Sequence, residues 1–112
     1  MTARGTIING TVSSYVVSQA DTNNEIGSIT LKKGTYIITG VVVCATGNKY
    51  FGVDIGGVAL YGSAPSYNGN NRASGTVMMK INNDNTVVKL QSYTIEANVP
   101  LIGTFLQAIK IS

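Results

Sequence analysis

Hydrophobic residues are densest between residues 27 and 45, where a short apolar segment leads through Lys32-Lys33-Gly34 into a longer one. Most of residues 35–43 are β-branched or aromatic, types that suit a pleated sheet and crowd a helix. Both alternating faces of this run are apolar: one carries Tyr36, Ile38, Val42 and Cys44, the other Ile37, Val41 and Val43. A half-exposed strand would carry polar residues on one face. The pattern therefore predicts a central strand that is covered on both sides.

Shorter alternating segments predict further strands at residues 5–9, 11–18, 28–31, 49–55, 58–61, 74–81, 86–93 and 104–111. Turn-forming residues separate them at 9–10, 32–34, 56–57 and 82–85. Residues 19–25 and 62–72 are predicted as loops. Residues 94–103 are predicted to be irregular or a short edge strand, because Pro100 cannot donate a ladder hydrogen bond. No segment favours a helix. We expect one all-β domain over residues 1–112, a jelly-roll β-sandwich of about eight to ten short antiparallel strands.

Charged residues make up only 12% of the 112 residues, about half the usual share in a soluble domain. The low charge content and a strand that is apolar on both faces together predict that some of the surface is hidden in an oligomer. The candidate interface residues are Tyr15, Val87, Phe105, Ile109 and Ile111. Alternatively, loops of the same chain cover both faces of the sandwich.

The net charge of +3 comes from dispersed basic residues, which argues against a nucleic-acid groove. No apolar run approaches the roughly 20 residues that span a bilayer, so membrane insertion is not expected. Residues 1–10 lack the apolar core of a signal peptide. The single Cys44 cannot form an intrachain disulfide and is expected to be a small buried hydrophobe, with a reactive thiol as the alternative.

The composition argues against an enzyme. The chain has no histidine, which removes the commonest general base and the commonest metal ligand. A glycosidase needs two carboxylates that face one substrate. Of the five carboxylates here, Asp21 and Glu25 are near each other in the sequence, but both fall in a predicted polar loop. We therefore predict no catalytic residues, no metal site and no cofactor.

The segment from Tyr61 to Arg72 is the best candidate for recognition. Its candidate binding residues are Tyr61, Tyr67, Asn68, Asn70, Asn71 and Arg72. Tyrosine offers a flat apolar face with a hydroxyl, and asparagine both donates and accepts hydrogen bonds. Such mixtures are typical of recognition loops. The alternative is a solvated loop in which asparagine and glycine only form turns.

Three segments together resemble the jelly roll of the tumour necrosis factor and complement globular-head family, especially its short versions at bacteriophage fibre tips. They are Leu31-Lys32-Lys33-Gly34-Thr35-Tyr36-Ile37-Ile38, the strand pair 75–81 and 86–93, and the closing strand Thr104-Phe105-Leu106-Gln107-Ala108-Ile109. The chain differs from the animal members in its low aromatic content and in the absence of a collagen-like stalk, which favours the phage type.

The resemblance implies a homotrimer in which one sheet of each protomer faces the three-fold axis. It also implies a virion protein, on a tail fibre or the capsid surface, whose exposed loops bind a host-surface glycan or protein. The alternative from a different functional class is a monomeric bacterial carbohydrate-binding β-sandwich, with Tyr67 in its site.

Overall fold

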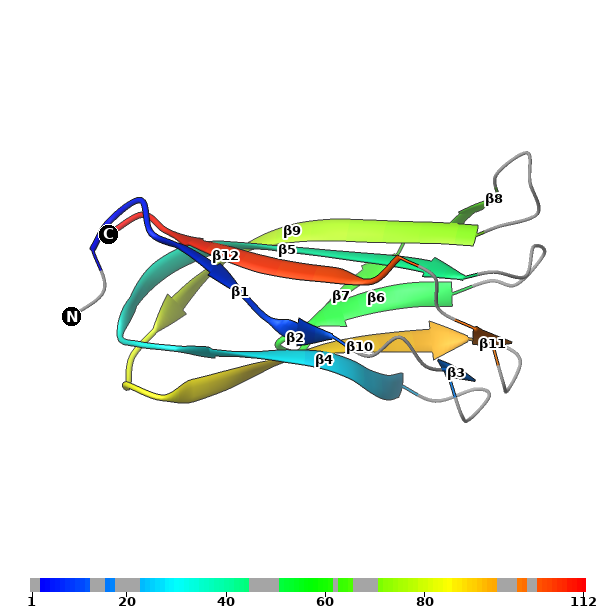
Figure 1. Ribbon diagram of the computed structural model, residues 1–112, viewed down its shortest axis with the longest axis horizontal. Coiled ribbons are helices and arrows are strands. Elements are labelled where there is room, and N and C mark those ends of the chain that lie inside the picture. The colour runs from blue at the N-terminus through cyan, green and yellow to red at the C-terminus, as the bar shows by residue number, and fades with distance from the viewer. Residues whose placement is uncertain are drawn as a thin grey trace.

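The computed structural model describes residues 3–12, 16–17, 23–44, 51–61, 63–65, 71–94, 99–100 and 103–112. The chain forms an elongated β-sandwich with extents of 43 × 25 × 20 Å (Figure 1). No helix occurs in the ranges just given. The all-β prediction is therefore confirmed.

The described strands, in chain order, are β1 (Ile7–Asn9), β2 (Thr11–Val12), β3 (Val16–Val17), β4 (Asn23–Leu31), β5 (Gly34–Cys44), β6 (Phe51–Ile55), β7 (Val58–Tyr61), β8 (Ser63–Pro65), β9 (Asn71–Ile81), β10 (Thr86–Thr94), β11 (Val99–Pro100) and β12 (Phe105–Lys110). They form two antiparallel five-stranded sheets and one short pair. Sheet A has the order β1-β12-β5-β9-β8, and sheet B has the order β2-β4-β10-β6-β7. β3 pairs with β11. Because β5 is the third of five strands in sheet A, its predicted central position is confirmed.

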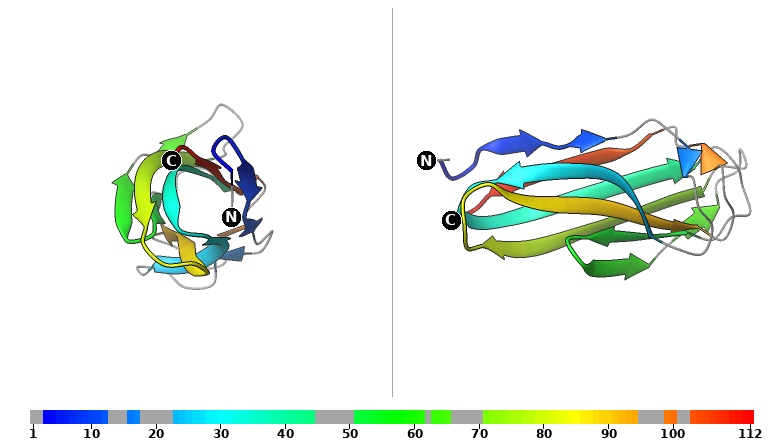
Figure 2. Two further views of the ribbon diagram at one scale, coloured as in Figure 1. Left: turned by 90° about the vertical axis from the view of Figure 1, so that its left-hand side faces the viewer. Right: turned by 90° about the horizontal axis from the view of Figure 1, so that it is seen from below.

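The chain passes from one sheet to the other at tight turns and at Gly10, where its backbone packs closely against neighbouring residues. The turns at residues 32–33 and 82–85 lead from β4 to β5 and from β9 to β10, and both lie at the end of the sandwich where the two termini lie (Figure 2). Gly10 takes the chain from β1 in sheet A to β2 in sheet B. A Cβ at Gly10 would lie 2.8 Å from both the Leu106 side chain and the Ser28 carbonyl oxygen, so glycine is needed for this crossing. The predicted hinge at residues 9–10 thus joins strands of different sheets.

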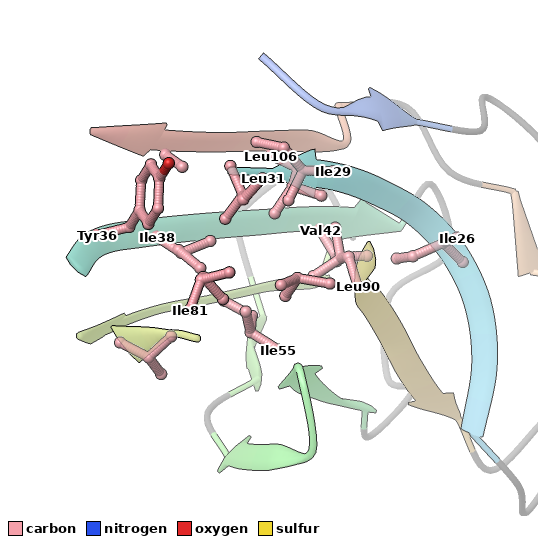
Figure 3. Packing of buried hydrophobic residues seen from close by; sticks show 13 residues of the cluster. Ile26, Ile29, Leu31, Tyr36, Ile38, Val42, Ile55, Ile81, Leu90 and Leu106 are labelled. Carbon is pink, nitrogen blue, oxygen red and sulfur yellow. The ribbon is translucent and has the colours of Figure 1, made fainter. Parts of the chain in front are cut away.

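The core lies between the two sheets and is made of aliphatic side chains with one tyrosine (Figure 3). Its buried members are Ile26, Ile29, Leu31, Tyr36, Ile38, Val42, Ile55, Val77, Ile81, Val88, Leu90, Leu106 and Ala108. They alternate along β5, β9, β10 and β12 with exposed or half-buried residues, because successive side chains of a strand point to opposite faces. Each of these strands therefore buries one set of side chains in the core.

Two predicted loops are partly wrong. Residues 23–25 belong to β4, because Asn23, Asn24 and Glu25 pair with β10 beyond a register shift at Leu90/Gln91. Within the predicted loop 62–72, β8 pairs with the first residues of β9. Cross-strand pairing outweighs the weak strand preference of asparagine and proline at these positions. The rest of both loops, residues 19–22, 62 and 66–70, lies outside the described residues.

Candidate interaction surfaces

The outer face of sheet A carries a row of exposed apolar side chains. The strand register places Ile7 opposite Ile109, Ile109 opposite Ile37, and Ile37 opposite Met78, so that the row crosses four strands. Exposed fractions are 56% for Ile7, 37% for Ile109 and 70% for Met78, and Ile37 is half-buried. These four side chains lie on the side of sheet A that is turned away from the core, and no described element covers them.

A polar row lies beside this apolar row. It consists of Asn9, Gln107, Thr39 and Thr76, which follow one another across the same four strands. The Gln107 Nε2 donates to Asn9 Oδ1 at 3.2 Å, and the Thr39 and Thr76 hydroxyl oxygens are 3.3 Å apart. These two pairs satisfy part of the row's hydrogen-bonding capacity within the chain, which lowers the cost of covering it.

A second apolar group follows the polar row. Phe105 lies opposite Val41, and Val41 lies opposite Ser74. Phe105 is exposed and Val41 is half-buried. By the outer face of sheet A we mean the side of the sheet that is turned away from the core. These two residues, with Ile7, Ile37, Met78 and Ile109, are among its apolar residues.

The two outer faces differ in charge. Among the described side chains, Lys80 at one margin is the only charged residue of the outer face of sheet A. The outer face of sheet B includes Glu25, Lys89 and Asp54, and Lys89 Nζ lies 3.7 Å from Glu25 Oε2. The outer face of sheet B therefore carries acidic and basic side chains, whereas the described side chains of the outer face of sheet A, apart from Lys80, are apolar or uncharged polar ones.

Three of the five candidate interface residues are brought together. Phe105 and Ile109 lie on the outer face of sheet A, and the half-buried Ile111 continues its alternation just beyond β12. Val87 is 54% exposed but lies on β10 opposite Thr30, in sheet B. Tyr15 lies outside the described residues. Ile7 and Met78 were missed, although outward alternation in residues 74–81 was a signal for Met78.

The candidate recognition residues are only partly described. Tyr61 ends β7 opposite Gly52, while Asn71 and Arg72 begin β9 opposite Cys44 and Val43. These strand ends point away from the end of the sandwich where the termini lie (Figure 1). Tyr67, Asn68 and Asn70 lie outside the described residues.

The described carboxylates form no catalytic pair. Glu25 is exposed on β4 beside Lys89, and Asp54 Oδ1 accepts a 2.9 Å hydrogen bond from the Gly57 amide, which fixes the β6–β7 turn. Asp84 accepts from the Lys33 amide at 2.8 Å. Asp21 lies outside the described residues. Cys44 ends β5, but its side chain is not among those described, so its predicted burial stays a prediction. Within the described residues, no three His, Cys, Asp or Glu side chains group together as metal ligands would.

A shallow hollow of about 310 Å³ lies along β2 and β4. Its lining consists of Thr11, Val12, Glu25, Ile26, Gly27 and Ser28. These residues offer hydroxyl groups and one carboxylate beside apolar carbon, but no aromatic ring on which a sugar could stack.

No protein-family model matches the chain, and no curated protein matches its sequence. Among the residues whose positions are described, no helix is long and apolar enough to cross a membrane.

Proposed function

We propose that this chain is a viral structural protein, the head domain of a bacteriophage fibre or spike. It forms a homotrimer and attaches the virion to a glycan or protein on the host surface. The observation that carries the proposal is the outer face of sheet A, which carries two groups of apolar side chains, has one charged residue among its described side chains and is open in the single chain. A second copy of the chain would cover it, as the low charge content also suggests.

The strand connections support a jelly roll. Successive strands move between the sheets: β1 lies in sheet A, β2 and β4 in B, β5 in A, β6 and β7 in B, β8 and β9 in A, β10 in B and β12 in A. β1 and β12, the first and last strands in chain order, are neighbours in sheet A, with Ile7 opposite Ile109. Such alternation is typical of jelly rolls.

A three-fold ring requires two different surfaces on each protomer, because its contacts are heterologous. The outer face of sheet A supplies one of them. We assign Val87, an exposed apolar residue on the outer face of sheet B, to the other. The polar row of Asn9, Gln107, Thr39 and Thr76 would then set the register of the packed surfaces.

The recognition residues fit the same arrangement. The strand ends at Tyr61, Asn71 and Arg72 lie toward the end of the sandwich away from both termini (Figure 1). Three copies arranged around the long axis would present this end together. Weak contacts made three at a time reach high avidity without any new chemistry.

Light scattering with three variants tests the trimer. The wild type is expected at about three times the 11.7 kDa chain mass. Met78→Asp and Val87→Asp should each lower that mass, because an unpaired charge is costly in an apolar interface. Asn83→Asp adds the same charge in an exposed turn and should leave the mass unchanged. A monomeric wild type would overturn the trimer and favour the carbohydrate-binding module.

A glycan array tests attachment separately. Binding is expected to disappear in Tyr67→Ala and Arg72→Ala, and to persist in Asn83→Ala, an exposed residue of the β9–β10 turn. Binding that is unchanged in the first two variants would remove this segment as the receptor site, whatever the oligomeric state.

A further inference from the structure

Cationic side chains gather at the end of the sandwich where both termini lie. Five of the protein's eight Lys and Arg residues are there: Arg4, Lys32, Lys33, Lys80 and Lys110. Figure 2 shows that the turns 32–33 and 82–85 and the two chain ends meet at this end. We call these five residues the basic end.

Hydrogen bonds hold the segments of the basic end together. The Lys33 amide donates to Asp84 Oδ1 at 2.8 Å, and Lys32 Nζ donates to Asn85 Oδ1 at 3.2 Å, so the two turns are joined. The Gly5 amide donates to the Lys110 carbonyl at 2.7 Å. The Lys110 side chain passes over Gly34, where a Cβ would lie 2.5 Å from its Cε. Lys80 lies opposite Thr35 on the neighbouring strand.

The described residues around the basic end neutralise only part of its positive charge. Asp84 is the one acidic side chain among the described residues at this end, and one of its oxygens is engaged by a main-chain amide. The main chain of Ser112 also ends here, and one of its oxygens accepts from the Thr35 amide at 2.9 Å. No described carboxylate forms an ion pair with any of the five cations, whereas Lys89, on the outer face of sheet B, pairs with Glu25. Four of the five cations are exposed, and Lys110 is half-buried.

The side chains at the basic end favour an acidic polypeptide over other anions. No exposed aromatic side chain occurs there among the described residues, because Tyr36 is buried, so sugar rings and nucleotide bases have no ring on which to stack. Four of the five cations are lysines, whose flexible point charges pair with carboxylates without fixed geometry. The exposed amides of Asn82, Asn83 and Asn85 can bond to the peptide groups of an extended chain.

We propose that the basic end is a docking surface for an acidic segment of another protein, separate from the recognition residues. Lys32 and Lys33 lie in the turn between β4 and β5, off the outer faces of both sheets, so the proposal applies to a monomer and to a trimer. In a trimer arranged around the long axis, three such ends would adjoin, and an acidic partner would also relieve their mutual repulsion.

Fluorescence anisotropy with a labelled glutamate-rich peptide tests the proposal on the full chain. We expect binding at low salt that weakens steeply as salt is added, since exposed charges are screened within about 10 Å at 0.1 M. Lys33→Glu and Lys80→Glu should each weaken binding by about fivefold, as loss of a steering charge does. Asp84→Asn should strengthen it, because the amide oxygen can still accept from Lys33 while the negative charge is lost.

Lys89→Glu is the matched control, since it makes the same charge change on the outer face of sheet B. Its binding should stay near that of the wild type. An equal loss in Lys89→Glu would show that net charge alone drives binding and would overturn the proposal. Tighter binding to heparin or duplex DNA of equal charge than to the peptide would overturn the proposal in favour of a polysaccharide or a nucleic acid. The absence of peptide binding at low salt would also refute the proposal.

Discussion

The hydroxyl of Tyr36 donates a 2.8 Å hydrogen bond to the main-chain carbonyl of Lys32. Tyr36 is fully buried near the start of β5, and Lys32 lies in the exposed turn that leads into β5. The bond therefore ties the crossing between the two sheets to the core. It explains why a tyrosine, and not a phenylalanine, suits this position among aliphatic neighbours.

Removing this hydroxyl should destabilise the protein. We expect Tyr36→Phe to lower the free energy of unfolding by about 0.5–1.5 kcal/mol, the usual net worth of such a bond. Urea denaturation measures the change. Lys32→Ala keeps the main-chain carbonyl and should have little effect. A Tyr36→Phe variant as stable as the wild type would show that the bond does not support the turn.

Val41 and Val42 are neighbours in β5 on opposite faces. Val42 is fully buried, whereas Val41 is half-buried on the outer face of sheet A. We expect Val42→Asp to prevent folding, since an unpaired charge in the core costs several kcal/mol, roughly the whole stability of a domain. Val41→Asp should fold but associate weakly. Circular dichroism and light scattering separate the two outcomes, and a folded, soluble Val42→Asp would contradict the core position.

Gly40 is buried in β5 and faces side chains of the opposite sheet. A Cβ there would lie 2.8 Å from Leu90 Cδ1 and 3.1 Å from Ile55 Cδ1. We expect Gly40→Ala to cost about 1–3 kcal/mol through overpacking. Leu90→Ala, which alone should cost about 2–5 kcal/mol, makes room for the methyl group. The double variant should therefore lose less stability than the two single changes added together; simple additivity would argue against this contact.

Asn85 closes the β9–β10 turn with a φ of 61°. A β-branched residue is strained in this left-handed region, whereas glycine is not. We expect Asn85→Val to cost about 1–2 kcal/mol. Asn85→Gly should stay within about 0.5 kcal/mol of the wild type, as exposed substitutions usually do. Thermal denaturation of the pair checks this, and equal stability of the two variants would refute the strain.

The sequence was most informative where the alternation was long and uniform. Inward and outward faces of β5, β9, β10 and β12 follow from a period of two, because each strand must bury one set of side chains. Pairing partners do not follow from it. Asn23 and Glu25 lie in β4 because β10 extends beside them, and a local pattern cannot show that neighbour.

The same limit applies to the candidate surfaces. Phe105 and Ile109 could be predicted as outward apolar residues of one strand. That Ile7 and Met78 join Ile109 in one row depends on the register of four strands that are far apart in sequence. Val87 has the same local pattern but lies in the other sheet, since only the chain's path between sheets decides which outer face a residue joins.

The neighbouring positions of β1 and β12 at the end where both termini lie have a mechanical consequence. Tension applied between residues 3 and 112 would peel β1 from β12 one hydrogen bond at a time, starting with the bond from the Gly5 amide to the Lys110 carbonyl. Tension applied between that end and the far strand ends at Tyr61 and Asn71 would instead load many ladder bonds at once, in shear. Anchored at one end and pulled from the other, the sandwich would resist rupture in its stiffest direction.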